Sequence, residues 1–244
     1  MGEDEISLSE YAHQLLAEHQ NERVFPFYFQ GKRFWLKQPE HLHGIFRLLK
    51  PHPKQSFLKE IERLQRLTSK NAPVPKLILF DDDFLILEDA GTTVNELISE
   101  NADNPEFKKS LLLASVQALN NLHQADFIHG RPAIRDMTWQ DNRILFIDFE
   151  VSSRNQDLQW QKIRDMAIFF HGLCRKKFIS DDEIQYAIEQ YRNICDPQLW
   201  QAFIQLLAKY KFVYYILRPI KSMIGTDIIA IYRLFDIFLD EKLI

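Results

Sequence analysis

Residues 122–150 have the sequence LHQADFIHGRPAIRDMTWQDNRILFIDFE, and the part from Phe127 to Phe149 contains no plausible long helix. Within it, Arg143 to Phe149 forms an apolar run that follows Asp141-Asn142, a dipeptide typical of tight turns, so a β-hairpin is predicted. The flanking segments differ, because residues 111–122 and 160–173 carry apolar side chains at helical spacing. The sequence therefore predicts a short hairpin inserted into a helical region.

The part of the chain before residue 91 has the patterns of strands and of isolated helices. Two aromatic-rich runs, Val24 to Phe29 and Arg33 to Lys37, surround a glycine-containing break and predict a β-hairpin. Further elements are predicted as follows: helices at Ser7 to Gln20 and at residues 57–67, and strands at Leu77 to Phe80 and Phe84 to Leu87. The predicted fold class is α+β, with one domain at residues 1–90 and a helical domain at residues 91–244.

The composition is that of an ordinary globular protein. With 244 residues, 46% hydrophobic, and a formal net charge of -4, the chain offers no broad attraction to nucleic acid, which we exclude as a partner. Cys174 and Cys195 lack metal-ligand spacing, and the acidic residues 1–5 do not resemble a cleavable leader. Three charged residues interrupt the apolar stretch at 224–239, so a membrane-spanning helix is not expected. A cytoplasmic location is predicted.

Several common site chemistries are excluded by missing motifs. His41, His43 and His52 have no further ligand at metal-binding spacing. The chain also lacks the GxxxxGK[ST], GxGxxG and GxSxG patterns, which disfavours P-loop, dinucleotide-binding and hydrolase functions.

Two loops carry a resemblance to a known family. Leu122-His123 through Phe127-Ile128-His129-Gly130, together with Ile147-Asp148-Phe149-Glu150, resemble the catalytic and metal-binding loops of protein-kinase-like phosphotransferases. The H-G-x-x-x-x-x-D and I-D-F-E forms are most similar to bacterial lipopolysaccharide-core and Kdo kinases. The resemblance implies a two-lobed kinase-like fold, with an N-lobe at 1–90 and a C-lobe at 91–244. It also implies ATP and Mg²⁺ as cofactors and the hydroxyl of a bacterial envelope sugar as the phosphate acceptor.

The resemblance also assigns roles to individual residues. Lys37 corresponds to the strand lysine and Glu60 to its helix partner, while Glu88 and Asp89 lie in the segment that resembles the hinge. These four residues are the expected nucleotide-binding set. Asp136 and Asp148 are the expected magnesium ligands, and Asp136, Arg131 and Asp148 are the expected catalytic residues. Asp165 corresponds to the aspartate buried beneath the catalytic loop.

Elementary chemistry supports the same residues, since phosphoryl transfer needs a cation for the phosphates and carboxylates for magnesium. Lys37 has the strand parity of Arg33 and Trp35, so it is expected on the face opposite Phe34 and Leu36. Its alternative role is that of a solvated charge at a strand end.

Glu60 lies beside the apolar stripe of its predicted helix, unlike Glu62, and is the better ion-pair partner for Lys37. The alternative is a carboxylate in water at the helix boundary.

Asp148 follows the apolar run Leu145-Phe146-Ile147, which would hold its carboxylate in place at a strand end. Asp136 lies twelve positions earlier, across the predicted turn, so a single hairpin would bring both carboxylates together. Asp136 has the alternative role of capping a turn. His129 is expected to tie backbone groups together rather than to transfer protons. Asp165, which lies among apolar neighbours, needs hydrogen-bond partners, and the loop amides are the expected ones.

Three departures from the family pattern leave two functions open. A glycine-rich phosphate loop is missing from the sequence, and Trp35 stands where a small residue usually faces adenine, so it either narrows the base pocket or stacks on the base. Arg131 replaces the catalytic-loop aspartate, and Asp136 replaces the metal-binding asparagine. Arg131 either stabilises the transferring phosphate or neutralises Asp136 or Asp148 at an empty site. The chain is accordingly an active phosphotransferase or a pseudokinase that binds nucleotide or a partner protein.

One further segment predicts contact with a membrane surface. Lys209, Lys211, Arg218 and Lys221 flank the apolar run Phe212 to Leu217, and no acidic residue occurs between positions 209 and 221. Such a segment favours peripheral contact with anionic lipid at the cytoplasmic face of the inner membrane. The alternative is a core helix with charged edges.

Overall fold

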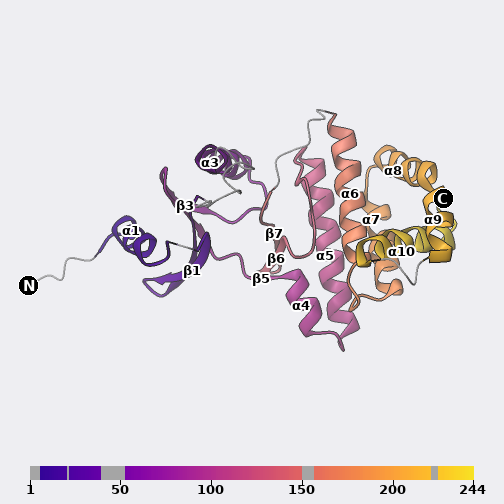
Figure 1. Cartoon of the computed structure of the whole chain (residues 1–244), viewed down its shortest axis with the longest axis horizontal. Coiled ribbons are helices and arrows are strands. Elements are labelled where there is room, and N and C mark those ends of the chain that lie inside the picture. The colour runs from indigo at the N-terminus through magenta and orange to yellow at the C-terminus, as the bar shows by residue number, and fades with distance from the viewer. Residues whose placement is uncertain (1–5, 21, 40–52, 150–156, 221–224) are drawn as a thin grey trace, which may run out of the picture. The chain divides into compact units, whose positions relative to one another are not determined.

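A computed structural model of the chain describes residues 6–20, 22–39, 53–149, 157–220 and 225–244 (Figure 1). The chain divides into two compact units, Met1–Ala90 (unit 1) and Gly91–Ile244 (unit 2). Unit 1 contains a small antiparallel sheet, and unit 2 is mostly helical. The predicted α+β class is confirmed.

Unit 1 is built around a four-stranded antiparallel sheet of order β1-β2-β4-β3, whose strands are β1 (Val24–Phe29), β2 (Lys32–Lys37), β3 (Leu77–Phe80) and β4 (Leu85–Glu88). The predicted β1–β2 hairpin is confirmed. Its two-residue turn, Gln30-Gly31, has φ values of 47° and 74°, as the hairpin turn that matches strand twist requires. Within the described residues of unit 1, the helices are α1 (Leu8–Glu18) and α3 (Pro53–Ser69).

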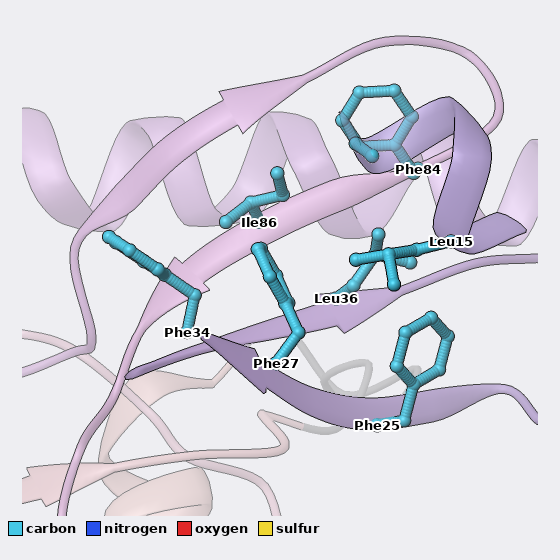
Figure 2. Packing of buried hydrophobic residues seen from close by; sticks show 8 residues of the cluster. Leu15, Phe25, Phe27, Phe34, Leu36, Phe84 and Ile86 are labelled. Carbon is cyan, nitrogen blue, oxygen red and sulfur yellow. The ribbon is translucent and has the colours of Figure 1, made fainter. Parts of the chain in front are cut away.

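The two faces of this sheet pack against different helices. On one face, side chains of β1, β2 and β4, including Phe34 and Leu36, pack with Leu15 of α1 (Figure 2). On the other face, Leu85 of β4 packs with Phe57 and Ile61 of α3. Because side chains alternate along a strand, burial of Phe34 and Leu36 against α1 assigns the remaining β2 positions to the α3 face.

Unit 2 contains a three-stranded sheet of order β5-β6-β7, made of β5 (Thr92–Thr93), β6 (Met137–Gln140) and β7 (Arg143–Phe146). The predicted hairpin is confirmed, and its turn at Asp141-Asn142 has φ values of 49° and 59°. The predicted strand at Arg143 to Phe149 is too long by three residues. Asp148 has a φ of 58°, a left-handed conformation that ends the extended backbone.

Strand β5 was not predicted, and Gly91 explains how it reaches β6. Gly91 has a φ of 81°, and a Cβ atom placed on it would lie 2.4 Å from the carbonyl oxygen of Trp139. A side chain at this position would therefore clash with backbone. Only glycine permits the close approach that starts the Thr92–Trp139 pairing.

The helices of unit 2 are α4 (Val94–Glu100), α5 (Pro105–Gln124), α6 (Leu158–Cys174), α7 (Asp181–Ile194), α8 (Pro197–Tyr210), α9 (Phe212–Leu217) and α10 (Thr226–Asp240), with a 3-10 turn η1 (Arg218–Ile220). Helix α7 packs against α5, and α6 packs against α8 and α10 (Figure 1). Ser180 and Glu183 form a capping box that begins α7. Across the described ranges, every helix is too short or too polar to span a lipid bilayer.

Both cysteines are free thiols buried in the helical core of unit 2. Burial raises the pKa of Cys174 to about 12 and that of Cys195 to about 11. Each is therefore a neutral thiol at ordinary pH, a state that disfavours metal binding and nucleophilic chemistry.

Candidate functional site

In unit 1, Lys37 and Glu60 form the expected ion pair. The Nζ atom of Lys37, in β2, donates to Oε1 of Glu60, in α3, and the two side chains are 12% and 28% exposed. A guanidinium nitrogen of Arg23 lies 3.9 Å from the other Glu60 oxygen. Glu62 is exposed. The pair holds the ammonium group of Lys37 in one position on the α3 face of the sheet, as an anion-binding lysine requires.

A second polar group of unit 1 joins Trp35, Asp89 and Arg33. The indole Nε1 of Trp35 donates to Oδ1 of Asp89 at 2.7 Å. The Arg33 guanidinium lies 5.3 Å from the Trp35 ring centroid and 3.8 Å from the same Asp89 oxygen. Trp35 is thus fixed at its polar edge and covered by a cation. Glu88 is exposed, and its amide donates to the carbonyl of Lys76 at 2.9 Å.

In unit 2, the loop that follows α5 is hydrogen-bonded to the side chain of Asp165. This side chain of α6 is fully buried and accepts hydrogen bonds from the amides of His129, at 2.9 Å, and Gly130, at 3.1 Å. The expectation that loop amides satisfy Asp165 is confirmed. His123 Nε2 lies 3.5 Å from the same carboxylate, and His123 Nδ1 lies 3.1 Å from the hydroxyl of Tyr191. Every charged or polar atom of this group is buried with a partner.

His129 connects the same loop to the end of β7. Its Nε2 lies 2.9 Å from the carbonyl oxygen of Ile147, and its Nδ1 accepts from the Arg131 amide at 3.3 Å. These partners assign the proton to Nε2 and make the imidazole neutral. The ring also lies 4.7 Å from that of Phe149. His129 therefore ties backbone groups together, as the sequence predicts.

The β6–β7 hairpin places Asp136 beside Asp148. Met137 pairs with Phe146, and the Ile147 amide donates to the Asp136 carbonyl at 2.9 Å, so Asp136 lies opposite the residue that precedes Asp148. The two carboxylates differ in exposure, since Asp136 is buried and the side chain of Asp148 is 57% exposed. The geometry thus joins one buried and one accessible carboxylate at the end of a hairpin.

Burial raises the pKa of the Asp136 carboxyl above its usual value. The positive charges of Arg135 and Arg131 act against this effect, and the negative charge of Asp148 acts with it. Arg135 Nε lies 3.5 Å from Oδ2 of Asp136. A carboxyl whose ionised form is disfavoured by its surroundings is typical of sites that bind a cation or a proton.

The positive charge of Arg131 acts on both carboxylates. Its Nη2 is 3.7 Å from Oδ2 of Asp148, and its charge also acts on Asp136. The preceding carbonyl, that of Gly130, accepts a hydrogen bond from Arg164 Nη1 at 2.5 Å. Both hydrogen-bonding groups of the Gly130–Arg131 peptide are therefore engaged, the carbonyl by Arg164 and the amide by His129.

Asp136 and Asp148 supply the oxygen ligands that Mg²⁺ prefers. They do not make a complete metal cage, and within the described ranges no cluster of three or more His, Cys, Asp or Glu side chains could hold a metal ion. A magnesium ion here would need phosphate and water oxygens as well, which is the usual arrangement for a nucleotide-bound ion. Glu150, His41, His43 and His52 lie outside the described residues.

Several residues of the site were not predicted from sequence. His123 had a usable signal, because it lies four positions after Leu119 and so continues the apolar stripe of α5. Arg135 and Arg164 had none, because nothing in the local pattern distinguishes them from ordinary surface arginines. Tyr191 lies 68 positions from His123, a separation at which sequence pattern says nothing about contact.

Comparison with known proteins identifies a homologous protein but no activity. No protein-family model matches the chain. A Haemophilus influenzae protein, described only as "Uncharacterized protein", is 46% identical over 234 residues, which cover 96% of each of the two chains. At that identity over almost the whole length, the chain belongs to the same family as this Haemophilus influenzae protein.

Proposed function

We propose that this protein is a magnesium-dependent phosphotransferase of the protein-kinase-like superfamily that moves the γ-phosphate of ATP to a hydroxyl group. The observation that carries the proposal is the loop at residues 129–136, whose amides are bound by the buried Asp165 and which ends at Asp136, next to Asp148. A loop held this firmly presents two carboxylates and Arg131 at fixed positions. Such preorganisation is what phosphoryl transfer requires of a protein.

In this proposal unit 1 is the N-lobe and unit 2 the C-lobe of a kinase-like fold. Lys37, oriented by Glu60, binds nucleotide phosphate. The segment with Glu88 and Asp89, at the end of β4, contacts the adenine, and the ring of Trp35 stacks on the base. The hydrogen bond from Trp35 to Asp89 and the arginine over its face support a fixed ring at this position.

Asp148 and Asp136 bind the magnesium ion carried by the nucleotide. The acceptor oxygen forms a bond to the γ-phosphorus, the bond from that phosphorus to the bridging oxygen breaks, and ADP leaves. The acceptor hydroxyl releases its proton to solvent water as the new bond forms. Asp136, a carboxyl whose pKa is raised by burial, is the group that orients this hydroxyl, and Arg131 stabilises negative charge on the transferring group.

The acceptor follows from the two loop motifs. Their similarity to lipopolysaccharide-core and Kdo kinases makes a bacterial envelope sugar the first acceptor class to test. The direct assay is transfer of labelled γ-phosphate from ATP to a panel of such sugars, with magnesium and with a chelator. Transfer to none of the sugars in magnesium would contradict this choice of acceptor.

A specific contact favours a second candidate, a pseudokinase that binds nucleotide or a partner without chemistry. The 3.7 Å approach of Arg131 to Asp148 places a cation beside the carboxylate that would otherwise bind magnesium. Such a cation can compete with the metal rather than assist it.

Arg131→Ala separates the two candidates by the sign of its effect on nucleotide affinity. If Arg131 stabilises the transferring phosphate, the substitution should reduce turnover by roughly 10³-fold or more and leave Mg-ATP affinity equal or lower. If Arg131 neutralises the metal site, Mg-ATP should bind more tightly. Thermal-shift titration measures affinity, because a ligand at about 100 times its Kd stabilises the native state by about 2.7 kcal/mol.

The matched control is Arg143→Ala, which removes an exposed arginine from the hairpin that follows the Arg131 loop. It should change neither turnover nor Mg-ATP affinity. Tighter Mg-ATP binding by Arg131→Ala, with no turnover by the unsubstituted protein on any acceptor, would overturn the enzymatic proposal in favour of the pseudokinase. An unchanged melting temperature of the unsubstituted protein in millimolar Mg-ATP would contradict the phosphotransferase and the nucleotide-binding pseudokinase, and would leave a pseudokinase that binds a partner.

A further inference from the structure

Helix α9 exposes large apolar side chains in an unusual concentration. Phe212, Tyr215 and Ile216 are 56%, 56% and 60% exposed, and α9 has no buried residue although it lies against α8 and α10 (Figure 1). Tyr210, at the end of α8, and Ile220, in η1, are exposed as well. Isolated exposed apolar residues are ordinary on protein surfaces, but five within eleven positions point to a surface that contacts something apolar.

Tyr214 shows that this exposure belongs to a well-anchored helix. Its hydroxyl donates to Asp236 of α10 at 2.8 Å, and its ring stacks on that of Tyr232 at 5.0 Å. Because Tyr214 faces α10, its neighbours Tyr215 and Ile216 project from other sides of a helix that has 3.6 residues per turn. The helix is thus fixed by one side chain while the apolar ones remain accessible.

The charges around α9 are positive. Lys209 and Arg218 are exposed at its two ends, and Lys211 donates to the backbone oxygen of Ile244 at 3.3 Å. Residues 209–226 contain no aspartate or glutamate. Of the nearby acids, Asp236 is hydrogen-bonded to tyrosine hydroxyls, and Asp227 pairs with Arg175 at 2.6 Å.

We propose that residues 209–220, the α9 surface, bind the surface of an anionic phospholipid bilayer, with the exposed side chains of α9 in the interface and the cations at the headgroups. Apolar side chains bordered by lysine and arginine are the pattern that such a surface selects. A second copy of the chain fits less well. A symmetric contact would bring the same cations together with no carboxylate of the segment to pair them, and interface cores are depleted of charge.

Co-sedimentation of the full chain with lipid vesicles tests the proposal. The protein should bind vesicles that contain about 30% phosphatidylglycerol and should not bind pure phosphatidylcholine, because each cation near an anionic surface adds favourable energy. Raising the salt from about 0.1 to about 0.5 M should release the unsubstituted protein. The salt response needs no variant and so does not depend on any substituted chain folding.

Two pairs of matched variants locate the binding. Lys209→Gln with Arg218→Gln should weaken anionic-vesicle binding about 30-fold, whereas Lys32→Gln with Lys59→Gln, which makes the same change in net charge in unit 1, should leave it unchanged. Likewise, Phe212→Ser with Ile216→Ser should abolish binding, and Val24→Ser with Phe80→Ser, at exposed positions of unit 1, should not.

Equal binding to neutral and anionic vesicles, equal loss in the paired controls, or no binding at all would each overturn the proposal. Sedimentation velocity adds a further decisive outcome. If the unsubstituted protein is a dimer that Phe212→Ser with Ile216→Ser makes monomeric, and neither binds vesicles, the surface is an interface between copies. This inference is independent of the proposed phosphotransfer, because none of the substituted residues belongs to the candidate site.

Discussion

Asp165 and the Asp136–Asp148 pair serve the same loop in opposite ways. Asp165 is fully buried and its carboxylate is satisfied by two loop amides and an imidazole. Asp136 is buried at a cost to its ionised form, and Asp148 is exposed with a left-handed backbone. The first arrangement stabilises the fold, whereas the second is what a site retains for a ligand.

This difference in burial and in hydrogen-bond partners distinguishes structural from functional carboxylates in one site. A structural carboxylate loses stability when removed, because its partners are left unsatisfied in the interior. A functional one is expected to be neutral or even stabilising when removed, since its energetic cost is met only by the ligand. Each of the following substitutions tests that contrast.

The largest effect is expected for Asp165→Ala. It leaves two buried amides without an acceptor and should lower the free energy of unfolding by about 3–5 kcal/mol. Chemical denaturation measures the change. Asp103→Ala, which removes an exposed carboxylate in the turn after α4, should change it by less than about 0.5 kcal/mol. Comparable losses of stability in the two variants would contradict a structural role for Asp165.

An intermediate effect is expected at Asp148. Its φ of 58° suits glycine, so Asp148→Gly should be more stable than Asp148→Ala by about 1 kcal/mol. Both variants should lose the magnesium dependence of any ATP-induced thermal shift. If magnesium still enhanced the shift in both, Asp148 would not be a metal ligand, whatever its backbone conformation.

The smallest effect is expected for Asp136→Asn, and it depends on pH. Burial raises the native pKa of Asp136 above 3.8, so the native state holds this proton more tightly than the unfolded chain does. Stability therefore falls as the pH rises from 3.8 through the native pKa, and the ionised carboxyl is unfavourable at neutral pH. Asp136→Asn should raise the melting temperature at pH 7 by at most a few degrees and leave it unchanged below about pH 4.

The melting temperature of Asp136→Asn also distinguishes a functional from a structural role for Asp136. A lower melting temperature of Asp136→Asn at pH 7 would show that the attraction of Arg135 and Arg131 outweighs burial. Asp136 would then belong with Asp165 among the structural carboxylates. In millimolar magnesium, the difference in melting temperature between Asp136→Asn and the unsubstituted protein should become smaller. The ion stabilises the ionised carboxylate, which only the unsubstituted protein has at position 136.

The sequence by itself determined the elements whose signals are local. Both hairpins follow from apolar runs around short turns, since Gly31, Asp141 and Asn142 are residue types that tolerate positive φ. Strand parity and helix periodicity predict which faces Lys37 and Glu60 occupy, but their pairing was expected from the resemblance to kinase-like phosphotransferases. The proximity of Asp136 to Asp148 follows from counting residues across a two-residue turn.

Only the tertiary structure decided the contacts made between distant segments. Strand β5 has just two residues, and its pairing depends on the close approach of Gly91 to Trp139. The 3.7 Å approach of Arg131 to Asp148 depends on side-chain placement within a loop. The support of His123 by Tyr191 depends on how α7 packs on α5. Periodicity fixes which face of an element is apolar, but partners far apart in sequence are chosen by packing, which no local pattern encodes.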